Sequence, residues 1–153
     1  MVPADSTQPG LAVFSPADIR RVLALPIEQL RNWRRHLPSI GQDRSGQALF
    51  DFADLLALAI VQRLVAGLGV RIGMIEPIAP QLVEACRCVN LEEAAAVRME
   101  FDLEGKRMML RPIEALPAEA LMILLPLGPT VKMLLARLTI PPTEPDTLPL
   151  FRQ

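Results

Sequence analysis

The sequence predicts a mainly helical protein with a small α+β unit in its second half. The composition is 51% hydrophobic and 22% charged, which is typical of a chain that forms a packed core. With 5 Phe, 1 Trp and no Tyr, that core must be built mainly from aliphatic residues, Met and Ala, which favour helices over sheets. Apolar residues recur at helical spacing in several segments, and one segment alternates as a strand does.

The first helix is predicted to begin at Ser15–Pro16, after a flexible arm at residues 1–13 that is rich in Pro, Gly and polar residues. Ser15 suits the N-cap and Pro16 the first helical position, and Asp18 lies where the helix dipole favours a carboxylate. Leu25–Pro26 ends this helix, because the residue before a proline is pushed out of the helical region.

A second helix is predicted from about residue 26 to 35. Leu30 and Trp33, three residues apart, face inward, and Trp33 is expected in the core. The outward side is rich in long hydrogen-bond donors that are able to reach base edges or phosphates. These outward residues are Glu28, Gln29, Arg31, Asn32 and Arg35.

A hairpin and two further helices complete the first half. Residues 37–48 contain glycines and polar residues typical of a projecting loop, or wing, and Leu49–Phe50 is its return strand. Asp51 caps a third helix over residues 52–67, which is apolar enough to be buried on more than one side. A short fourth helix from Arg71 is limited by Pro77 and Pro80. This order is that of a winged helix-turn-helix, which presents a basic helix and a loop to a DNA groove.

The second half is predicted to be a small α+β unit. Residues 81–88 are helical by composition, 91–96 form a turn, and 97–103 with 106–111 form a β-hairpin around Glu104–Gly105. Residues 118–127 are compatible with either helix or strand. A last helix covers residues 131–138, and a proline-rich tail follows from 139 to 153.

Charge is distributed unevenly along a chain whose formal net charge is only −1. Residues 16–46 hold six arginines against three acidic residues, a local balance of +3. From residue 76 onward eleven acidic residues face eight basic ones. We therefore expect any phosphate contact to be local and sensitive to salt.

Several classes of function are excluded or disfavoured. Cys86 and Cys88 are too close for an unstrained disulfide, and with the lone His36 distant we expect two buried thiols and no metal or cofactor. No nucleophile with a histidine base and no phosphate-binding glycine loop is recognisable, so we do not expect an enzyme. The N-terminus does not look like a secretory signal, and residues 55–70 are too short and too polar to span a bilayer, which predicts a cytoplasmic protein.

Residues 14–76 resemble the DNA-binding domain of the MerR family of bacterial transcriptional regulators. Leu30–Arg31–Asn32–Trp33 is similar to the family's Leu-Arg-x-Tyr/Trp signature in the recognition helix. Arg44–Ser45–Gly46, Leu49–Phe50 and Ala53–Asp54–Leu55 follow the family's wing and the entry to its third helix, and residues 68–75 resemble its closing element. The chain departs from the family where Gly46–Gln47–Ala48 replaces the usual Gly-Tyr-Arg, and where prolines replace the start of a long dimerising coiled coil.

The resemblance implies a transcriptional regulator that binds duplex DNA in a sequence-specific manner, with the second helix in the major groove and Arg44 on the flanking backbone. Since the coiled coil is missing, a homodimer would be formed differently, through residues 80–138. The expected organisation is an arm (1–13), a MerR-like domain (14–76), a small α+β unit (77–138) and a tail (139–153). The expected DNA-binding residues are Arg20, Gln29, Arg31, Asn32, Arg34, Arg35, Arg44 and Gln47.

Alternative functions remain open at this point. The missing wing arginine and the near-neutral charge favour a MerR-like adaptor that binds protein, and a phage or plasmid packaging or excision factor would use the same domain. In the tail, Leu148, Leu150 and Phe151 form an apolar segment that either packs on its own domain or is offered to a protein partner. That segment is similar to the peptide that docks on bacterial sliding clamps, with Thr147 in place of the usual Gln.

Overall fold

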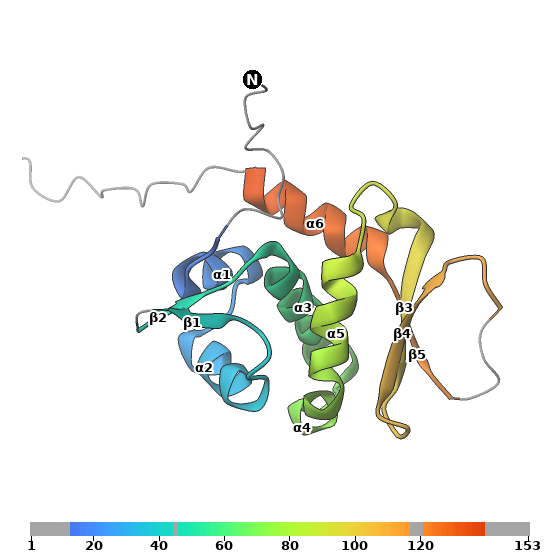
Figure 1. Ribbon diagram of the computed structural model, residues 1–153, viewed down its shortest axis with the longest axis horizontal. Helices are drawn as coiled ribbons and strands as arrows, with labels where there is room; N and C mark the ends of the chain where they lie inside the picture. The colour runs from blue at the N-terminus through green and yellow to red at the C-terminus, as the bar shows by residue number, and fades with distance from the viewer. Residues whose placement is uncertain (1–12, 45, 117–120, 140–153) are drawn as a thin grey trace, which may run out of the picture.

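The computed structural model describes residues 13–44, 46–116 and 121–139. It confirms a mainly helical fold in which a helical body carries a small hairpin on one side and a three-stranded antiparallel sheet on the other (Figure 1). The predicted arm and tail lie almost wholly outside the described residues, as do Leu148, Leu150 and Phe151. Within the described part, no helix is both long and apolar enough to cross a membrane.

Helix α1 (Pro16–Leu23) begins with a capping box between Ser15 and Asp18. The Asp18 backbone N–H donates to Ser15 Oγ at 3.2 Å, and the Ser15 N–H donates to Asp18 Oδ2 at 2.9 Å. Both bonds satisfy donors that have no partner within the helix. Ala24 ends α1 in the left-handed conformation, and Leu25–Pro26 leads into the next helix as the sequence predicted.

Helix α2 (Ile27–His36) packs against α1 through the side that carries Leu30 and Trp33. Trp33 is only 2% exposed, which confirms its prediction as a core residue. The predicted helix matches the observed one to within a residue at each end.

The predicted wing is a two-stranded antiparallel hairpin of β1 (Gln42–Arg44) and β2 (Gln47–Leu49). Gly46 lies in its turn with a φ of +76°, a conformation that glycine adopts without steric cost. At the base of the hairpin Phe14 and Phe50 form an antiparallel bridge through two backbone hydrogen bonds of 2.6 and 3.0 Å. The bridge attaches the residues that precede α1 to the root of the wing.

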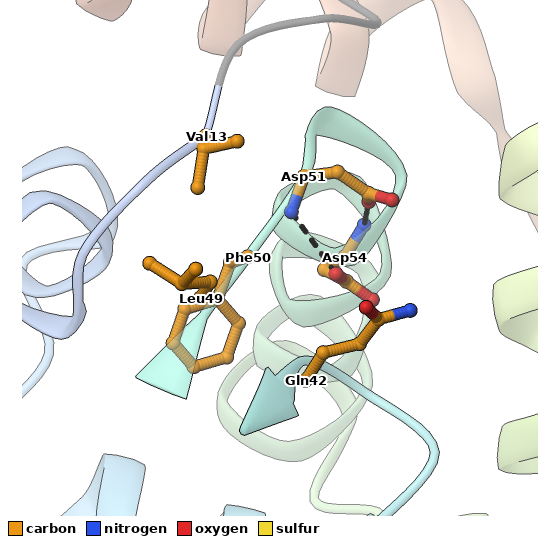
Figure 2. Close-up of a pocket in the computed structure, with 6 residues that line it drawn as sticks. All are labelled: Val13, Gln42, Leu49, Phe50, Asp51 and Asp54. Carbon is orange, nitrogen blue, oxygen red and sulfur yellow. Dashed lines mark hydrogen bonds between the residues drawn. The ribbon is translucent and has the colours of Figure 1, made fainter. Parts of the chain in front are cut away.

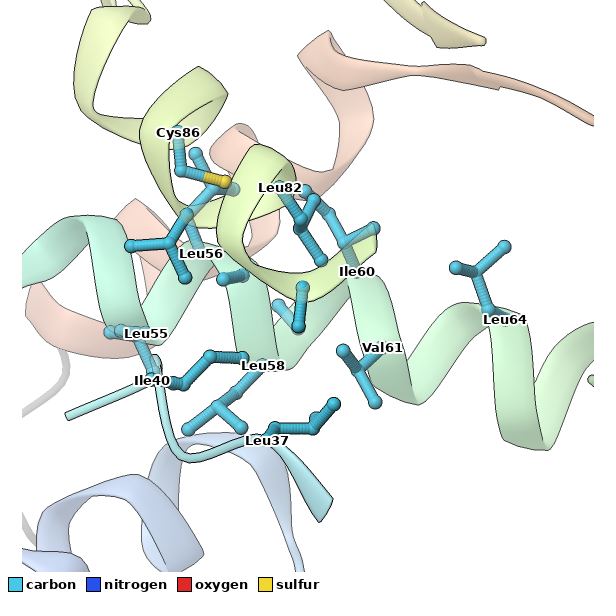
Figure 3. Close-up of a cluster of buried hydrophobic side chains, with 14 of the residues drawn as sticks. Leu37, Ile40, Leu55, Leu56, Leu58, Ile60, Val61, Leu64, Leu82 and Cys86 are labelled. Atoms are coloured by element: carbon cyan, nitrogen blue, oxygen red, sulfur yellow. The ribbon is translucent and has the colours of Figure 1, made fainter. Parts of the chain in front are cut away.

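Helix α3 (Phe52–Gln62) is the centre of the molecule, with nine of its eleven residues buried. A capping box between Asp51 and Asp54 begins it, which confirms Asp51 as the cap. Figure 3 shows its apolar side chains between Leu37 and Ile40 on one side and Leu82 and Cys86 on the other. The helix predicted to reach residue 67 does so, but Arg63–Gly67 (η2) is a π-helix, whose wider turns continue the path of α3.

The chain stays helical through both prolines that were predicted to limit the fourth helix. Helix α4 (Ile72–Ile75) does end before Pro77, but it passes directly into η3 (Glu76–Ile78) and then α5 (Ala79–Cys88). Each proline lies at one of the first two positions of its segment, where its missing N–H costs no helical hydrogen bond. Cys86 is buried, but Cys88 is exposed, so the prediction of two buried thiols is wrong for Cys88.

The sheet of the second half has the strand order β4–β3–β5. After a 3₁₀ turn at η4 (Ala94–Ala96), β3 (Val97–Asp102) and β4 (Arg107–Pro112) form the predicted hairpin. β5 (Ile123–Pro126) pairs antiparallel with β3, so the segment left open between helix and strand is a strand here. Helix α6 (Leu127–Thr139) begins four residues earlier than predicted, directly after β5.

The outer face of the sheet buries an ion pair. Arg98 is 6% exposed and Glu100 is fully buried, with Arg98 Nη2 donating to Glu100 Oε1 at 2.7 Å. Arg98 also donates to the carbonyls of Ile113 and Ala115 at 2.8 and 2.6 Å. A buried guanidinium stays in place only when its donors are satisfied, so this pair ties the segment after β4 onto the sheet.

One hydrophobic core runs from Ile19 in α1 to Leu134 in α6. α6 packs against α1, α3 and the central strand β3, and it lies across the upper side of the helical body in Figure 1. Arg137 Nη1 adds a 2.7 Å hydrogen bond to the carbonyl of Val22, 115 residues away in sequence. The end of the chain's last helix therefore supports the end of its first.

Candidate nucleic-acid interface

The arginines of α2 gather on its exposed side, where Glu28, Arg31, Arg34 and Arg35 line one surface hollow of about 510 Å³. The side chain of Arg31 is 65% exposed and pairs with Glu28 at 3.1 Å, one helical turn away. Such exposed pairs are weak, typically about 0–1 kcal/mol, so a phosphate or a base edge is able to displace the glutamate. This side of α2 offers several positive groups to one ligand surface.

Arg34 connects this helix to the wing. Its guanidinium lies over the ring of Phe50, 5.6 Å from the ring centroid, in a cation–π arrangement. Phe50 is fully buried and directly follows β2, so the contact orients α2 relative to the root of the hairpin. The sequence pattern indicated Phe50 as the end of the return strand but did not indicate this stacking role.

The other predicted residues lie in different environments. Gln47 is exposed and faces Arg44 in the register of the hairpin. Gln29 and Asn32 are half-buried on α2. Arg20 is also half-buried, and its Nε is buried without a hydrogen-bond partner among the residues that the structure describes. The exposed members, Arg31, Arg35 and Gln47, are therefore the best placed for a ligand.

The root of the wing contains an acidic pair, Asp51 and Asp54, of which the sequence analysis assigned only Asp51 to helix capping. Asp51 and Asp54 line a small hollow of about 230 Å³ with Phe50 and Gln42, and Figure 2 shows their reciprocal hydrogen bonds. Burial is the main reason why the pKa of Asp54 is raised, and the negative charge of Asp51 adds to it. Arg87 on α5 lies 3.7 Å from Asp51 and 4.0 Å from Asp54, which partly balances this charge.

The C-terminal end of α2 is held by a contact from the following part of the chain. His36 Nδ1 lies 3.2 Å from Glu76 Oε2 in η3, and α2 packs against the neighbouring α4. His36 is the last residue of α2. This contact attaches the C-terminal end of the basic helix to η3.

The arrangement of this part of the chain is that of a winged helix-turn-helix. Two short helices, α1 and α2, are followed in the chain by the β1–β2 wing and by the buried helix α3. Residues 14–82 match the family model of the MerR HTH family of regulatory proteins. The match covers 69 of the 153 residues, and the helix-turn-helix of this part of the chain is consistent with a MerR-type domain. The match extends six residues beyond the predicted limit at residue 76 and includes both prolines.

Neither the curated proteins nor the solved structures contain a match to this chain. The match to the MerR family supports a role for this protein as a DNA-binding regulator of transcription. Among the described residues, no group of three or more His, Cys, Asp or Glu side chains is arranged to hold a metal ion.

Proposed function

We propose that this protein binds duplex DNA at specific sequences and controls transcription, with α2 in the major groove and the wing on the flanking backbone. The observation that carries this proposal is the set of arginines on the exposed side of α2, one of which stacks on the root of the wing. Guanidinium groups bond guanine edges and phosphates in pairs of parallel hydrogen bonds. We assign Arg31 to base or phosphate contacts, Arg35 and Arg44 to phosphates, and Gln47 to the wing contact.

The remaining predicted residues take supporting roles in this proposal. Gln29 and Asn32, half-buried on α2, contact the groove edge at its margins. Arg34 positions the helix through Phe50, and Arg20 at the end of α1 reaches a phosphate beside the groove. Phosphate contacts of this kind set the register of the protein on DNA, and base contacts set its sequence preference.

We further propose that the protein acts as a homodimer through residues 80–138. Three large apolar side chains in the segment between β4 and β5 support this, since Ile113 is 42%, Leu116 84% and Leu121 99% exposed. Burial of such large apolar side chains against a partner removes their surface from water, which favours association. Light scattering should give the mass of a dimer for the natural chain and of a monomer for Leu116→Asp, and a monomeric natural chain would refute this part of the proposal.

The decisive test is Arg31→Ala, measured on a site selected from a random duplex library. We expect it to weaken binding by about 1–3 kcal/mol and to relax sequence preference at one position. Arg107→Ala is the matched control, because the Arg107 side chain is similarly exposed, at 72%, and is also paired with an acid. Equal affinities of Arg31→Ala and the natural chain for the selected site would contradict the assignment.

A protein-binding adaptor is the second candidate. Two features favour an adaptor. Arg31 is paired with Glu28, which lowers its net charge, and Gln47–Ala48 occupies the position where a MerR family member has Tyr-Arg, so a wing arginine for phosphate contact is missing. The two candidates differ in salt dependence, because binding to DNA releases counterions in proportion to the phosphates contacted. A series of gel shifts across salt concentrations should show a steep fall in DNA affinity if DNA is the ligand, whereas weak binding at every concentration would favour the adaptor.

A further inference from the structure

An open hollow of about 650 Å³ lies where η2, β5 and α6 meet, away from the arginine face of α2. Sites for small molecules usually measure about 300–1,000 Å³, so this hollow has the size of a ligand site. Its walls include Ala66 and Leu68 from the π-helix and its end, Leu124 from β5 and Met133 from α6. A π-helix within an α-helical path often accompanies a functional site.

The apolar part of this hollow is unusually exposed. Leu68 is 59% exposed and Leu124 is 41% exposed, whereas Leu64, which lies in η2 and does not line the hollow, is fully buried. Contact of these side chains with the apolar part of a ligand would remove their surface from water, which favours binding.

The polar part of the hollow is positive. Arg63 and Arg137 line it, and no acidic side chain among the described residues does so. Arg63 forms no ion pair with any residue in the described ranges, and Arg137 uses Nη1 for the Val22 carbonyl. A guanidinium has five N–H donors, so both arginines keep donors for an anion. An apolar wall beside two guanidinium groups is complementary to a small molecule with a hydrocarbon part and one carboxylate or sulfonate.

We propose that this hollow is a binding site for amphipathic organic anions such as medium-chain carboxylates. The hydrocarbon part lies against Leu68, Leu124 and Met133, and the anionic group accepts hydrogen bonds from Arg63 and Arg137.

The site is connected directly to the helix-turn-helix. Arg137 Nη1 donates to the Val22 carbonyl and Gln62 Nε2 to the Leu23 carbonyl, both at 2.7 Å, and these are the last two residues of α1. An anion that draws Arg137 toward the hollow competes with one of these bonds and loosens the end of α1. This second step, a change in DNA affinity, rests on the proposed DNA-binding function; the binding of the anion does not.

The test uses the full chain and the fluorescent amphipathic anion 1-anilinonaphthalene-8-sulfonate, with decanoate as the competitor. We expect one saturable site from which decanoate displaces the dye. Leu124→Asp should weaken dye binding by at least about tenfold, because it places a negative charge on the apolar wall. Met109→Asp is the matched control: Met109 is also 41% exposed, and both residues face Glu100 from the two edge strands of one sheet.

A second pair of variants tests the charge. Arg63→Gln should weaken dye binding by roughly tenfold, and Arg107→Gln, which removes the same charge at the opposite edge of the sheet, should not. Circular dichroism confirms folding, and Leu68→Asp replaces Leu124→Asp if the latter unfolds. Equal dye affinity in Leu124→Asp and Met109→Asp, or in Arg63→Gln and Arg107→Gln, would overturn the site.

The DNA response is measured separately, by titrating the selected duplex with and without decanoate. A change in DNA affinity that disappears in Arg63→Gln supports the connection through α1. Unchanged DNA affinity at saturating decanoate overturns that connection. Because the dye is titrated without DNA, a protein that fails to bind DNA still reports on the hollow.

Discussion

Gly41 shows how a single residue sets the shape of the wing root. Its φ is +85°, and a Cβ placed on it would lie 2.7 Å from Cε1 of the buried Phe50 ring. Any other residue therefore meets both an unfavourable backbone conformation and the ring on which Arg34 stacks.

We expect Gly41→Ala to lower the free energy of unfolding by about 2–4 kcal/mol, the combined cost of a left-handed alanine and a displaced core side chain. Urea unfolding measures this value. Gly73→Ala is the control, since a Cβ there meets nothing within 4 Å and its φ is not positive. Equal stabilities of the two variants would contradict the role of Gly41.

The two cysteines should differ sharply in reactivity. Burial raises the pKa of the Cys86 thiol, and the nearby carboxylates of Asp54 and Asp51 raise it further, so Cys86 stays a protonated thiol. Cys88, the last residue of α5, is exposed. We expect a thiol reagent to label Cys88 rapidly in the folded chain and to label Cys86 only in denaturant. Rapid labelling of folded Cys88→Ser would show that Cys86 is accessible.

At the scale of elements, the start of α3 combines a capping box with a buried charge. Asp51 and Asp54 satisfy each other's backbone N–H groups at 2.8 and 3.0 Å, which helps to hold α3 at the root of the wing. Burial raises the pKa of Asp54 above its unfolded value. Asp54 therefore adds stability that is fully present below its unfolded pKa and is lost as pH rises through its folded pKa.

The variant Asp54→Asn isolates this effect, because its amide oxygen still accepts the Asp51 N–H but does not titrate. We expect the stability of the natural chain, relative to the variant, to fall as pH rises from about 4 through the raised folded pKa and then to level off. Urea unfolding at a series of pH values measures the difference. A difference that rises with pH over this window would show that the carboxylate is stabilised when charged.

Elements with a strong local signal were predicted well. Ser15 and Asp51 cap helices as predicted, and the alternation predicted over residues 97–103 forms a strand over Val97–Asp102. The sequence analysis missed the change to π-helix at Arg63 and the continued helix through Pro77, because both depend on neighbours. Packing of α3 against α5 and α6 decides how far that central helix continues.

At the scale of the whole molecule, one core joins the MerR-type domain to the sheet and α6. The domain boundary that the sequence analysis placed near residue 76 stays a prediction. Because the residues on both sides of it share one core, we expect the helix-turn-helix and the C-terminal unit to unfold together. We expect Leu134→Ala in α6 to cost about 2–5 kcal/mol, since Leu134 is fully buried.

Two probes test this cooperativity. The midpoint of Trp33 fluorescence, which reports on α2, should shift with Leu134→Ala by the same amount as the midpoint of circular dichroism. Trp33 is the only tryptophan in the chain, so its signal is unambiguous. Lys132→Ala, at an exposed position of the same helix, should leave both midpoints in place. An unchanged Trp33 midpoint in Leu134→Ala would show that the two parts unfold independently.

The sequence by itself determined the first two helices, the caps at Ser15 and Asp51, the hairpins and the likeness to MerR regulators, because capping, apolar periodicity and turn residues act within a few neighbours along the chain. It also placed Arg31 and Arg35 on the outward side of α2. Only the tertiary structure decided that Arg34 stacks on Phe50, that Asp54 and Glu100 are buried, and that Arg63 and Arg137 share one hollow. These contacts join residues that are separated in the sequence, and they form only when the helices, the wing and the sheet pack together.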